Sequence, residues 1–210
     1  MKFLLGGIPE NADFHPEQGG WQRLREPGPW VMQVLGLPIG IGVVIVLGLA
    51  VAWLGMLDFE HVHPAVVFFV LVGMIPLHEC LHLFAHPRMG GSPHSIVGFW
   101  PATLLFFAHY DHQLSRNRFV WILATPFLVV SVMPLIVCGL AGWRWGWVGL
   151  LSMWNGLCAY GDLFGVLLVI WQVPRRAIVS NQGYWTWWIL PEDLAAQNTP
   201  ARDEPPPEGP

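Results

Sequence analysis

Charged residues are scarce in this chain. Asp, Glu, Lys and Arg together make up 11% of its 210 residues, whereas about 25% is typical of soluble globular domains. Hydrophobic residues make up 54%, and the mean hydropathy is +0.48. This composition excludes an ordinary soluble domain and indicates a membrane protein. We therefore expect the lipid bilayer to be one of its partners.

Cysteine and basic residues are also few. Cys80, Cys138 and Cys158 show no C-x-x-C spacing, and all three lie in apolar segments. This pattern excludes a disulfide framework and a zinc ribbon. The ten Lys and Arg residues form no basic patch, so we expect no nucleic-acid partner.

Four apolar segments are long enough to cross the roughly 30 Å hydrocarbon layer, which takes about 20 helical residues. They cover residues 30–57, 64–85, 119–140 and 147–171. Tryptophans lie near their ends, where indole rings favour the headgroup level; these are Trp30, Trp53, Trp121, Trp143, Trp145, Trp147 and Trp171. The predicted fold is an all-α membrane protein with about four transmembrane helices.

The distribution of Lys and Arg predicts the orientation of these helices. Nine of the ten fall on one side, because they precede the first span, separate the second from the third, or follow the fourth. Only Arg144 falls on the other side. Cytoplasmic loops carry the excess of basic residues, so we expect both termini to be cytoplasmic in a multi-pass protein of a plasma or inner membrane.

Four regions follow from this reading. Residues 1–28 are a cytoplasmic N-terminal segment, and residues 29–172 are a polytopic membrane domain. Within that domain, residues 96–109 are apolar but too short to span, which favours a re-entrant loop or a membrane-dipping β-hairpin. Residues 173–190 contain Trp185, Trp187 and Trp188 and are predicted to be interfacial, and residues 191–210 form an acidic, proline-rich, disordered tail.

The second apolar segment contains the pattern H-E-x-x-H. On a helix His78 and His82 share one face and can offer two imidazole nitrogens to a single zinc ion. Glu79 lies one position further round, where it can act as the general base on zinc-bound water. The pattern indicates metal-assisted hydrolysis.

Two carboxylates lie inside the four predicted spans, Glu79 and Asp162. A charged side chain near the centre of a membrane helix costs about 2.5 to 3.5 kcal/mol, so each is a candidate for function. Glu79 lies 15 residues after Pro64, and Asp162 lies 15 residues after Trp147. Because these two spans run in the same direction, the two carboxylates reach a similar depth. We therefore predict Zn²⁺ bound by His78, His82 and Asp162.

Other residues compete for roles at this site. His86 continues the four-residue spacing after His82 and is a rival third ligand, and Cys158 lies one turn before Asp162. Asn155, two turns before Asp162, is a candidate contact for the substrate backbone or for an oxyanion. It could equally join helices by a buried hydrogen bond. The cluster at residues 109–112 is a weaker candidate for a second metal site.

Two motifs carry a resemblance to a known family. His78-Glu79-Cys80-Leu81-His82 and the Asn155-x6-Asp162 spacing resemble the small zincin membrane peptidases, which are distantly similar to the site-2 intramembrane metalloproteases. The resemblance covers residues 64–171. It implies zinc ligation by the two histidines and Asp162, a catalytic Glu79, and a β element at residues 96–110 that presents substrate.

This chain departs from the site-2 pattern at Asp162. Gly161 precedes this aspartate and Leu163 follows it, where site-2 proteases carry Leu-Asp-Gly, and Asn155 is followed by glycine rather than proline. No PDZ-like domain is visible.

The predicted function is that of a zinc-dependent, membrane-embedded metallopeptidase. Its substrates would be membrane-associated proteins. Two other functions remain open from the sequence: a divalent-metal transporter or sensor, and a catalytically inactive, zinc-stabilised membrane subunit. A transporter needs the ligands but not the general base, so Glu79 separates the first alternative from an enzyme.

Overall fold

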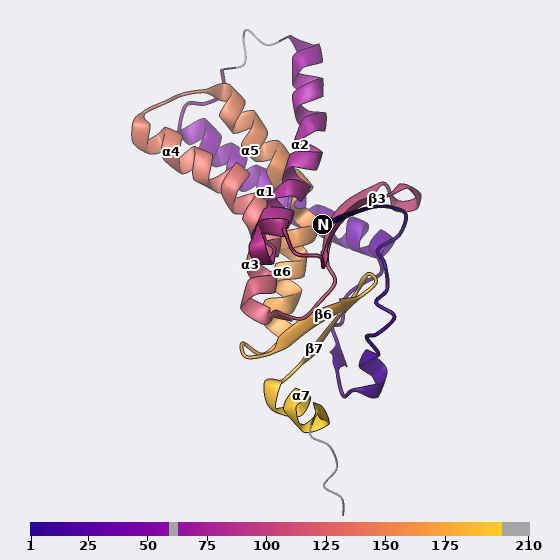
Figure 1. Cartoon of the computed structure of the whole chain (residues 1–210). Coiled ribbons are helices and arrows are strands. Elements are labelled where there is room, and N and C mark those ends of the chain that lie inside the picture. The colour runs from indigo at the N-terminus through magenta and orange to yellow at the C-terminus, as the bar shows by residue number, and fades with distance from the viewer. Residues whose placement is uncertain (59–62, 199–210) are drawn as a thin grey trace, which may run out of the picture.

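The computed structural model describes residues 1–58 and 63–198 (Figure 1). Three helical stretches are long and apolar enough to cross a membrane: α1 (Pro29–Trp53), α2 (Pro64–Ala85) and Arg116–Ala141. The third consists of α3 (Arg116–Pro126), a π-helical segment η4 (Phe127–Val132) and α4 (Met133–Ala141). These stretches match the first three predicted spans.

The fourth predicted span is not one continuous helix. Helix α5 (Gly146–Cys158) and helix α6 (Tyr160–Gln172) meet at Ala159 with a bend of 55°. The pair is apolar enough to count as a fourth span only if it is taken as one broken crossing. Ala159 is fully buried and its backbone leaves the helical region. The flanking Gly156 and Gly161 lower the helix propensity here.

Two small sheets make the all-α prediction inexact. In the first sheet, β1 (Lys2–Leu5) pairs in parallel with β3 (Ser95–Trp100), which pairs antiparallel with β4 (Leu105–Tyr110). The second sheet has the antiparallel order β2 (Gln22–Arg23), β7 (Trp185–Ile189), β6 (Ile178–Gln182) and β5 (Leu114–Ser115). Short 3-10 turns at Pro16–Gln18, Pro87–Gly90 and Pro101–Thr103 complete the described elements. The predicted N-terminal segment (residues 1–28) and the predicted interfacial segment (residues 173–190) therefore both contribute strands.

The short apolar segment between the second and third spans is a β-hairpin, one of the two forms predicted for it. Strands β3 and β4 pair from Ser95↔Tyr110 to Trp100↔Leu105. A Cβ atom added at Gly98 would lie 2.5 Å from the carbonyl oxygen of Leu4 and 2.5 Å from the ring of Phe107. Only glycine lets the three strands approach this closely.

The predicted disordered tail begins instead with a helix. Helix α7 spans Pro191–Asn198, and residues 199–210 of the tail lie outside the described residues. Proline at the first helical position and Glu192 and Asp193 in the first turn favour this start.

Two arginines at the start of α3 bind the ends of the helices that carry the predicted site. Arg118 donates to the carbonyl of His86, the residue that caps α2, at 3.1 Å. Arg116 donates to the carbonyl of Ile170, in the last turn of α6, also at 3.1 Å. A cation at a helix C-terminus satisfies carbonyls that have no helical donor. The two helices are thereby tied together at one level.

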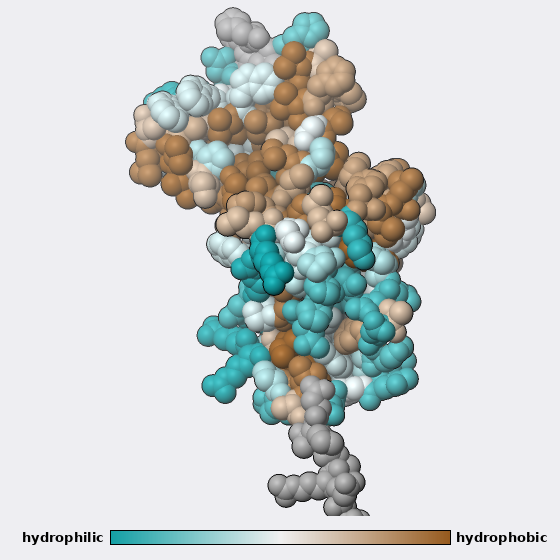
Figure 2. All heavy atoms as spheres, in the orientation of Figure 1, coloured by the Kyte–Doolittle hydropathy of each residue, from teal (hydrophilic) through white to brown (hydrophobic). Residues whose placement is uncertain are grey.

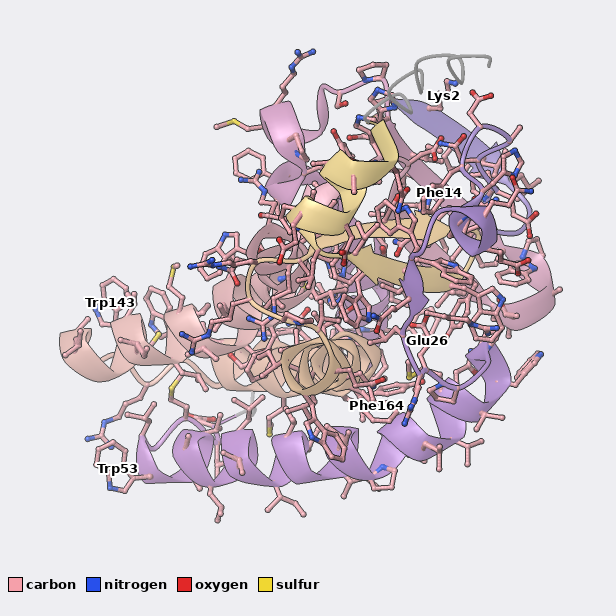
Figure 3. The ribbon with its side chains drawn as sticks, turned by 90° about the horizontal axis from the view of Figure 1, so that it is seen from below. Lys2, Phe14, Glu26, Trp53, Trp143 and Phe164 are labelled. Carbon is pink, nitrogen blue, oxygen red and sulfur yellow. The ribbon has the colours of Figure 1, made fainter. Side chains whose placement is uncertain are left out.

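The surface is divided into an apolar and a polar half. Figure 2 shows hydrophobic residues over α1, α2, α4 and α5, and hydrophilic residues over the part that contains β6, β7 and α7. Trp53 and Trp143 lie near the ends of α1 and α4, away from Lys2 and Phe14 (Figure 3). This arrangement fits an apolar band with an aromatic rim.

Candidate metal centre and substrate pocket

The H-E-x-x-H motif lies on the last two turns of α2. His78 and His82 are each 5% exposed, and the helix places both on its inner face. One ligand atom from each of His78, Glu79 and His82 lies within 4.8 Å of the others. Away from this motif and the residues beside it, no second group of three or more His, Cys, Asp or Glu side chains converges in this way among the described residues. The weaker candidate site at residues 109–112 therefore does not bring three ligand atoms together.

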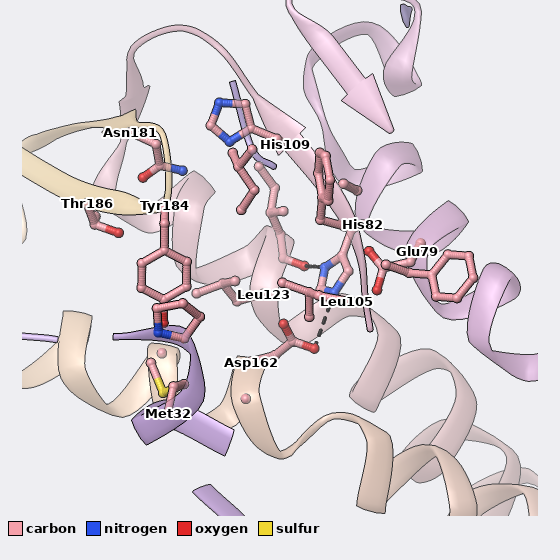
Figure 4. Close-up of a pocket in the computed structure, with 18 of the residues that line it drawn as sticks. Met32, Glu79, His82, Leu105, His109, Leu123, Asp162, Asn181, Tyr184 and Thr186 are labelled. Carbon is pink, nitrogen blue, oxygen red and sulfur yellow. Dashed lines mark hydrogen bonds and ion pairs between the residues drawn. The ribbon is translucent and has the colours of Figure 1, made fainter. Parts of the chain in front are cut away.

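Asp162 completes a triangle of ligand atoms with the two histidines. It lies in the first turn of α6, where the helix dipole favours a carboxylate. Its Oδ2 atom is 3.2 Å from Nε2 of His82 (Figure 4). The same oxygen is 2.9 Å from Nε2 of His78, and the two Nε2 atoms are 3.2 Å apart. The structure thus brings together all three residues that the sequence suggested as ligands.

The second nitrogen of His82 is held by the backbone of α3. Its Nδ1 lies 2.9 Å from the carbonyl oxygen of Ile122. A carbonyl only accepts, so Nδ1 carries the proton and Nε2 of the neutral ring presents a lone pair. Ile122 stands four residues before Pro126, whose nitrogen has no hydrogen to donate back to it.

Asn155 holds His78 in the same way. Its Nδ2 donates to the carbonyl of Pro126 at 3.1 Å and to Oγ of Ser131 at 2.9 Å, so Oδ1 faces Nδ1 of His78 at 3.0 Å. His78 therefore also presents a lone pair at Nε2. Asn155 is 1% exposed and uses its amide group fully. It lies against His78 and is not among the described residues that line the pocket, and its contact with the substrate or an oxyanion stays a prediction.

This donor set fits a zinc ion. Ligands about 2.0 to 2.1 Å from a tetrahedral zinc are roughly 3.3 to 3.4 Å apart, and the three distances in the triangle are 2.9, 3.2 and 3.2 Å. Two imidazoles and one carboxylate are a usual ligand set of catalytic zinc sites. In such sites the second nitrogen of each imidazole is usually held by a hydrogen bond, as it is here.

The two rival ligands lie outside the triangle. Nδ1 of His86 is 3.3 Å from Oγ of Ser95, and its ring packs against Tyr110. Cys158 lines the adjoining pocket but does not belong to the cluster. Pro126 and Ser131 were missed, although a proline and a serine inside an apolar span are the signal that could have pointed to them.

A cavity of about 590 Å³ opens beside the triangle. Helices α2, α3 and α6, the start of α1, strand β4 and the β6–β7 turn all contribute to its wall. In Figure 4 Glu79 and His82 lie on one side of this pocket, and Asn181, Tyr184 and Thr186 lie on the other. The pocket therefore extends from the motif to the second sheet.

Strand β4 presents a free backbone edge along this pocket. At the end of the β3–β4 ladder, the backbone N–H of Asp111 donates to the carbonyl of His94. In an antiparallel pair, every second residue of a strand bonds its partner strand, and the residues between them point their N–H and C=O groups the other way. Phe106, Ala108 and Tyr110 are such residues, so their backbone groups point away from β3. Because β4 is the last strand of its sheet, these groups have no partner among the described strands. The Ala108 N–H points instead to the carboxylate of Glu79.

Comparison with known families agrees with this geometry. Residues 71–178, about half of the chain, match the model of the family described as "Putative zincin peptidase". The chain belongs to this family. The matched region contains the H-E-x-x-H motif, the β3–β4 hairpin, Asn155 and Asp162. No curated protein and no solved structure matches the chain.

Proposed function

We propose that this zincin-family chain is a membrane-embedded zinc metallopeptidase that hydrolyses peptide bonds of membrane-associated proteins. The observation that carries the proposal is the triangle of His78, His82 and Asp162, in which both imidazoles are oriented from behind. His78, His82 and Asp162 would hold the zinc ion, and Glu79 would be the general base. The three to four apolar helices support the membrane location.

Zinc supplies a more acidic water and a polarised substrate carbonyl when bound. Glu79 accepts a proton from water and returns it to the nitrogen of the departing amine. The hydrogen bond from the Ala108 N–H supports the orientation of this carboxylate. Asn155 and Ile122 keep the protons of His78 and His82 on Nδ1, on the side away from the pocket.

The free edge of β4 supports a mode of substrate binding. A peptide bond inside a helix is shielded by its own hydrogen bonds, so a membrane helix must be extended before it is cut. An extended segment can pair as an added strand with the backbone of Phe106 and Tyr110 and with the carbonyl of Ala108, while the Ala108 N–H stays bonded to Glu79. This strand would run beside Glu79, because Ala108 contacts that side chain.

The orientation of the protein in the membrane is also a proposal. Arg116 and Arg118 directly follow β5, and Arg175 and Arg176 precede β6, so these four arginines adjoin the second sheet. An excess of basic residues marks the cytoplasmic face. We therefore place the second sheet and both termini in the cytoplasm of a cell whose plasma or inner membrane holds the protein.

The test compares wild type, Glu79→Gln and Asp162→Ala, each purified in detergent after metal-replete expression. We expect about one zinc per chain in wild type and in Glu79→Gln, and loss of zinc in Asp162→Ala. New protein N-termini in membranes of expressing cells, quantified by mass spectrometry, should appear with wild type alone. Zinc absent from all three proteins would overturn the proposal.

Two other outcomes correspond to the alternative functions. Zinc flux into proteoliposomes that persists in Glu79→Gln would indicate a transporter, because transport needs no general base. Zinc binding by a wild type that generates no new N-termini and carries no flux would indicate a structural subunit.

A further inference from the structure

The end of the pocket opposite the H-E-x-x-H motif is lined by polar side chains that the proposed hydrolysis does not use. These are Glu26, His109, Asn181, Tyr184 and Thr186, called here the polar end. Figure 4 shows four of them, and Asn181, Tyr184 and Thr186 lie across the pocket from Glu79. A pocket with a metal centre at one end and a polar group of residues at the other suits a substrate held at two points.

Glu26 lies beyond the end of β2, and its side chain is hydrogen-bonded to Thr186 of the second sheet. Its Oε1 accepts from the backbone N–H of Thr186, and its Oε2 accepts from Oγ1 of Thr186 at 3.3 Å. Thr186 on β7 stands directly opposite Asn181 on β6. Residues directly opposite in an antiparallel pair share one face of the sheet. Glu26 and Asn181 therefore both adjoin Thr186, the first through hydrogen bonds and the second across the strand pair, and both line the pocket.

Two buried polar atoms at the polar end have no hydrogen-bond partner in the part of the chain that the structure describes. They are Nε2 of His109, a residue only 5% exposed, and Oδ1 of Asn181. A buried polar atom without a partner costs about 1 to 3 kcal/mol. Native structures tolerate few such atoms, and two lining one pocket indicate a polar ligand group that satisfies them.

The charge of the polar end indicates which kind of ligand group it binds. Glu26 contributes a carboxylate, and neither Lys nor Arg is among the residues that line the pocket. The guanidinium of Arg23 lies over the Trp185 ring, 3.8 Å from its centre; it does not line the pocket, although its charge opposes the increase that burial causes in the pKa of Glu26. A cationic hydrogen-bond donor would complement this acceptor-rich end.

We propose that the polar end binds a protonated amine of the substrate, with Glu26 as its counter-ion and Asn181 and His109 as further hydrogen-bond partners. The amine is either the N-terminal amino group of the peptide or a lysine side chain. This inference rests on the proposed peptidase function, because it assigns the second contact of the same bound chain.

The experiment measures binding rather than hydrolysis. Full-length Glu79→Gln protein in detergent is titrated against a short apolar peptide of alternating Ala and Leu with a fluorophore at its C-terminal end, and anisotropy is recorded. Three forms are compared: a free N-terminus, an acetylated N-terminus, and an acetylated N-terminus followed by lysine. We expect at least one of the two amine-bearing peptides to bind about tenfold or more tightly than the acetylated peptide without lysine. The peptide that binds more tightly identifies the source of the amine.

Variants at the polar end complete the design. Glu26→Gln, added to Glu79→Gln, keeps an oxygen acceptor for the Thr186 N–H and should abolish the preference for the amine. Glu10→Gln is the matched control, because Glu10 lines a neighbouring cavity instead. Asn181→Asp adds a second carboxylate and should strengthen the preference.

Equal affinity for all three peptides, absence of binding, or a preference that survives Glu26→Gln would overturn the proposal. Because Glu79→Gln cannot hydrolyse, these outcomes do not depend on catalysis. A preference for the amine, found together with a wild type that generates no new N-termini, would refute the peptidase function alone.

Discussion

Pro126 determines which nitrogen of His82 carries the proton. In a regular helix the carbonyl of Ile122 would accept from the backbone N–H of residue 126, but proline has none. The carbonyl is thus left to accept from Nδ1 of His82 at 2.9 Å. Pro126 also accepts from Asn155, which holds His78. One proline therefore supports both imidazoles of the candidate metal centre.

Pro126→Ala tests this support. Alanine restores a backbone N–H that competes with His82 for the carbonyl of Ile122, so His82 should lose its fixed orientation. Loss of a hydrogen bond behind a metal ligand typically costs 10- to 100-fold in affinity, and we expect about a tenfold weaker zinc affinity in a chelator competition titration. Pro38→Ala is the control, since it removes a helix-interior proline from α1. Equal affinities of the two variants would contradict the role of Pro126.

Asn155→Ala separates two roles for Asn155. If it orients His78, as the hydrogen bond at 3.0 Å indicates, zinc affinity should fall about 10- to 100-fold. If it only contacted substrate, zinc affinity would stay at the wild-type value and turnover alone would fall. Chelator competition gives the affinity. Thermal unfolding of the zinc-free proteins checks the fold, because Ala leaves the buried partners Pro126 and Ser131 short of a donor.

The residues of the candidate metal centre were largely predictable from the sequence. Charged residues inside apolar spans are costly, so Glu79 and Asp162 were conspicuous, and helical spacing joined His78 to His82. The residues behind the ligands were not predictable. The sequence does not show whether Asn155 faces a substrate, a metal ligand or another helix. The structure does, because Asn155 donates to the carbonyl of Pro126 and thereby turns its own oxygen toward His78.

The sheets could not be predicted for a different reason. Strand β1 pairs with β3, more than 90 residues away, and β2 pairs with β7, more than 160 residues away. Local periodicity shows that a segment can form a strand, but it does not show its partner. The bend at Ala159 was missed because hydropathy continues unbroken across it. Apolar composition predicts a crossing, whereas backbone geometry decides whether the helix is continuous.

Phe106→Pro tests the free edge of β4. Proline removes the N–H at a position that does not bond β3, so the hairpin should survive while an added strand loses one hydrogen bond. We expect about a tenfold lower rate of new N-terminus formation in membranes of expressing cells. Phe106→Ala is the control, because it removes the ring but keeps the N–H. A rate for Phe106→Pro that equals the rate for Phe106→Ala would argue against strand addition.

Glu26→Gln should change how stability depends on pH. Burial raises the pKa of Glu26 from 4.5 to about 7, although its hydrogen bonds from Thr186 oppose the shift. Between about pH 4.5 and 7 the unfolded chain ionises before the folded one, so this residue lowers stability progressively as pH rises through that window. Glutamine does not ionise, so in Glu26→Gln this fall in stability does not occur. We expect Glu26→Gln to match wild type near pH 4.5 and to exceed it by about 2 kcal/mol at pH 8, as measured by reversible denaturation in mixed micelles. Glu10→Gln, which changes the net charge equally, provides the control, and a stability difference independent of pH would contradict the raised pKa of Glu26.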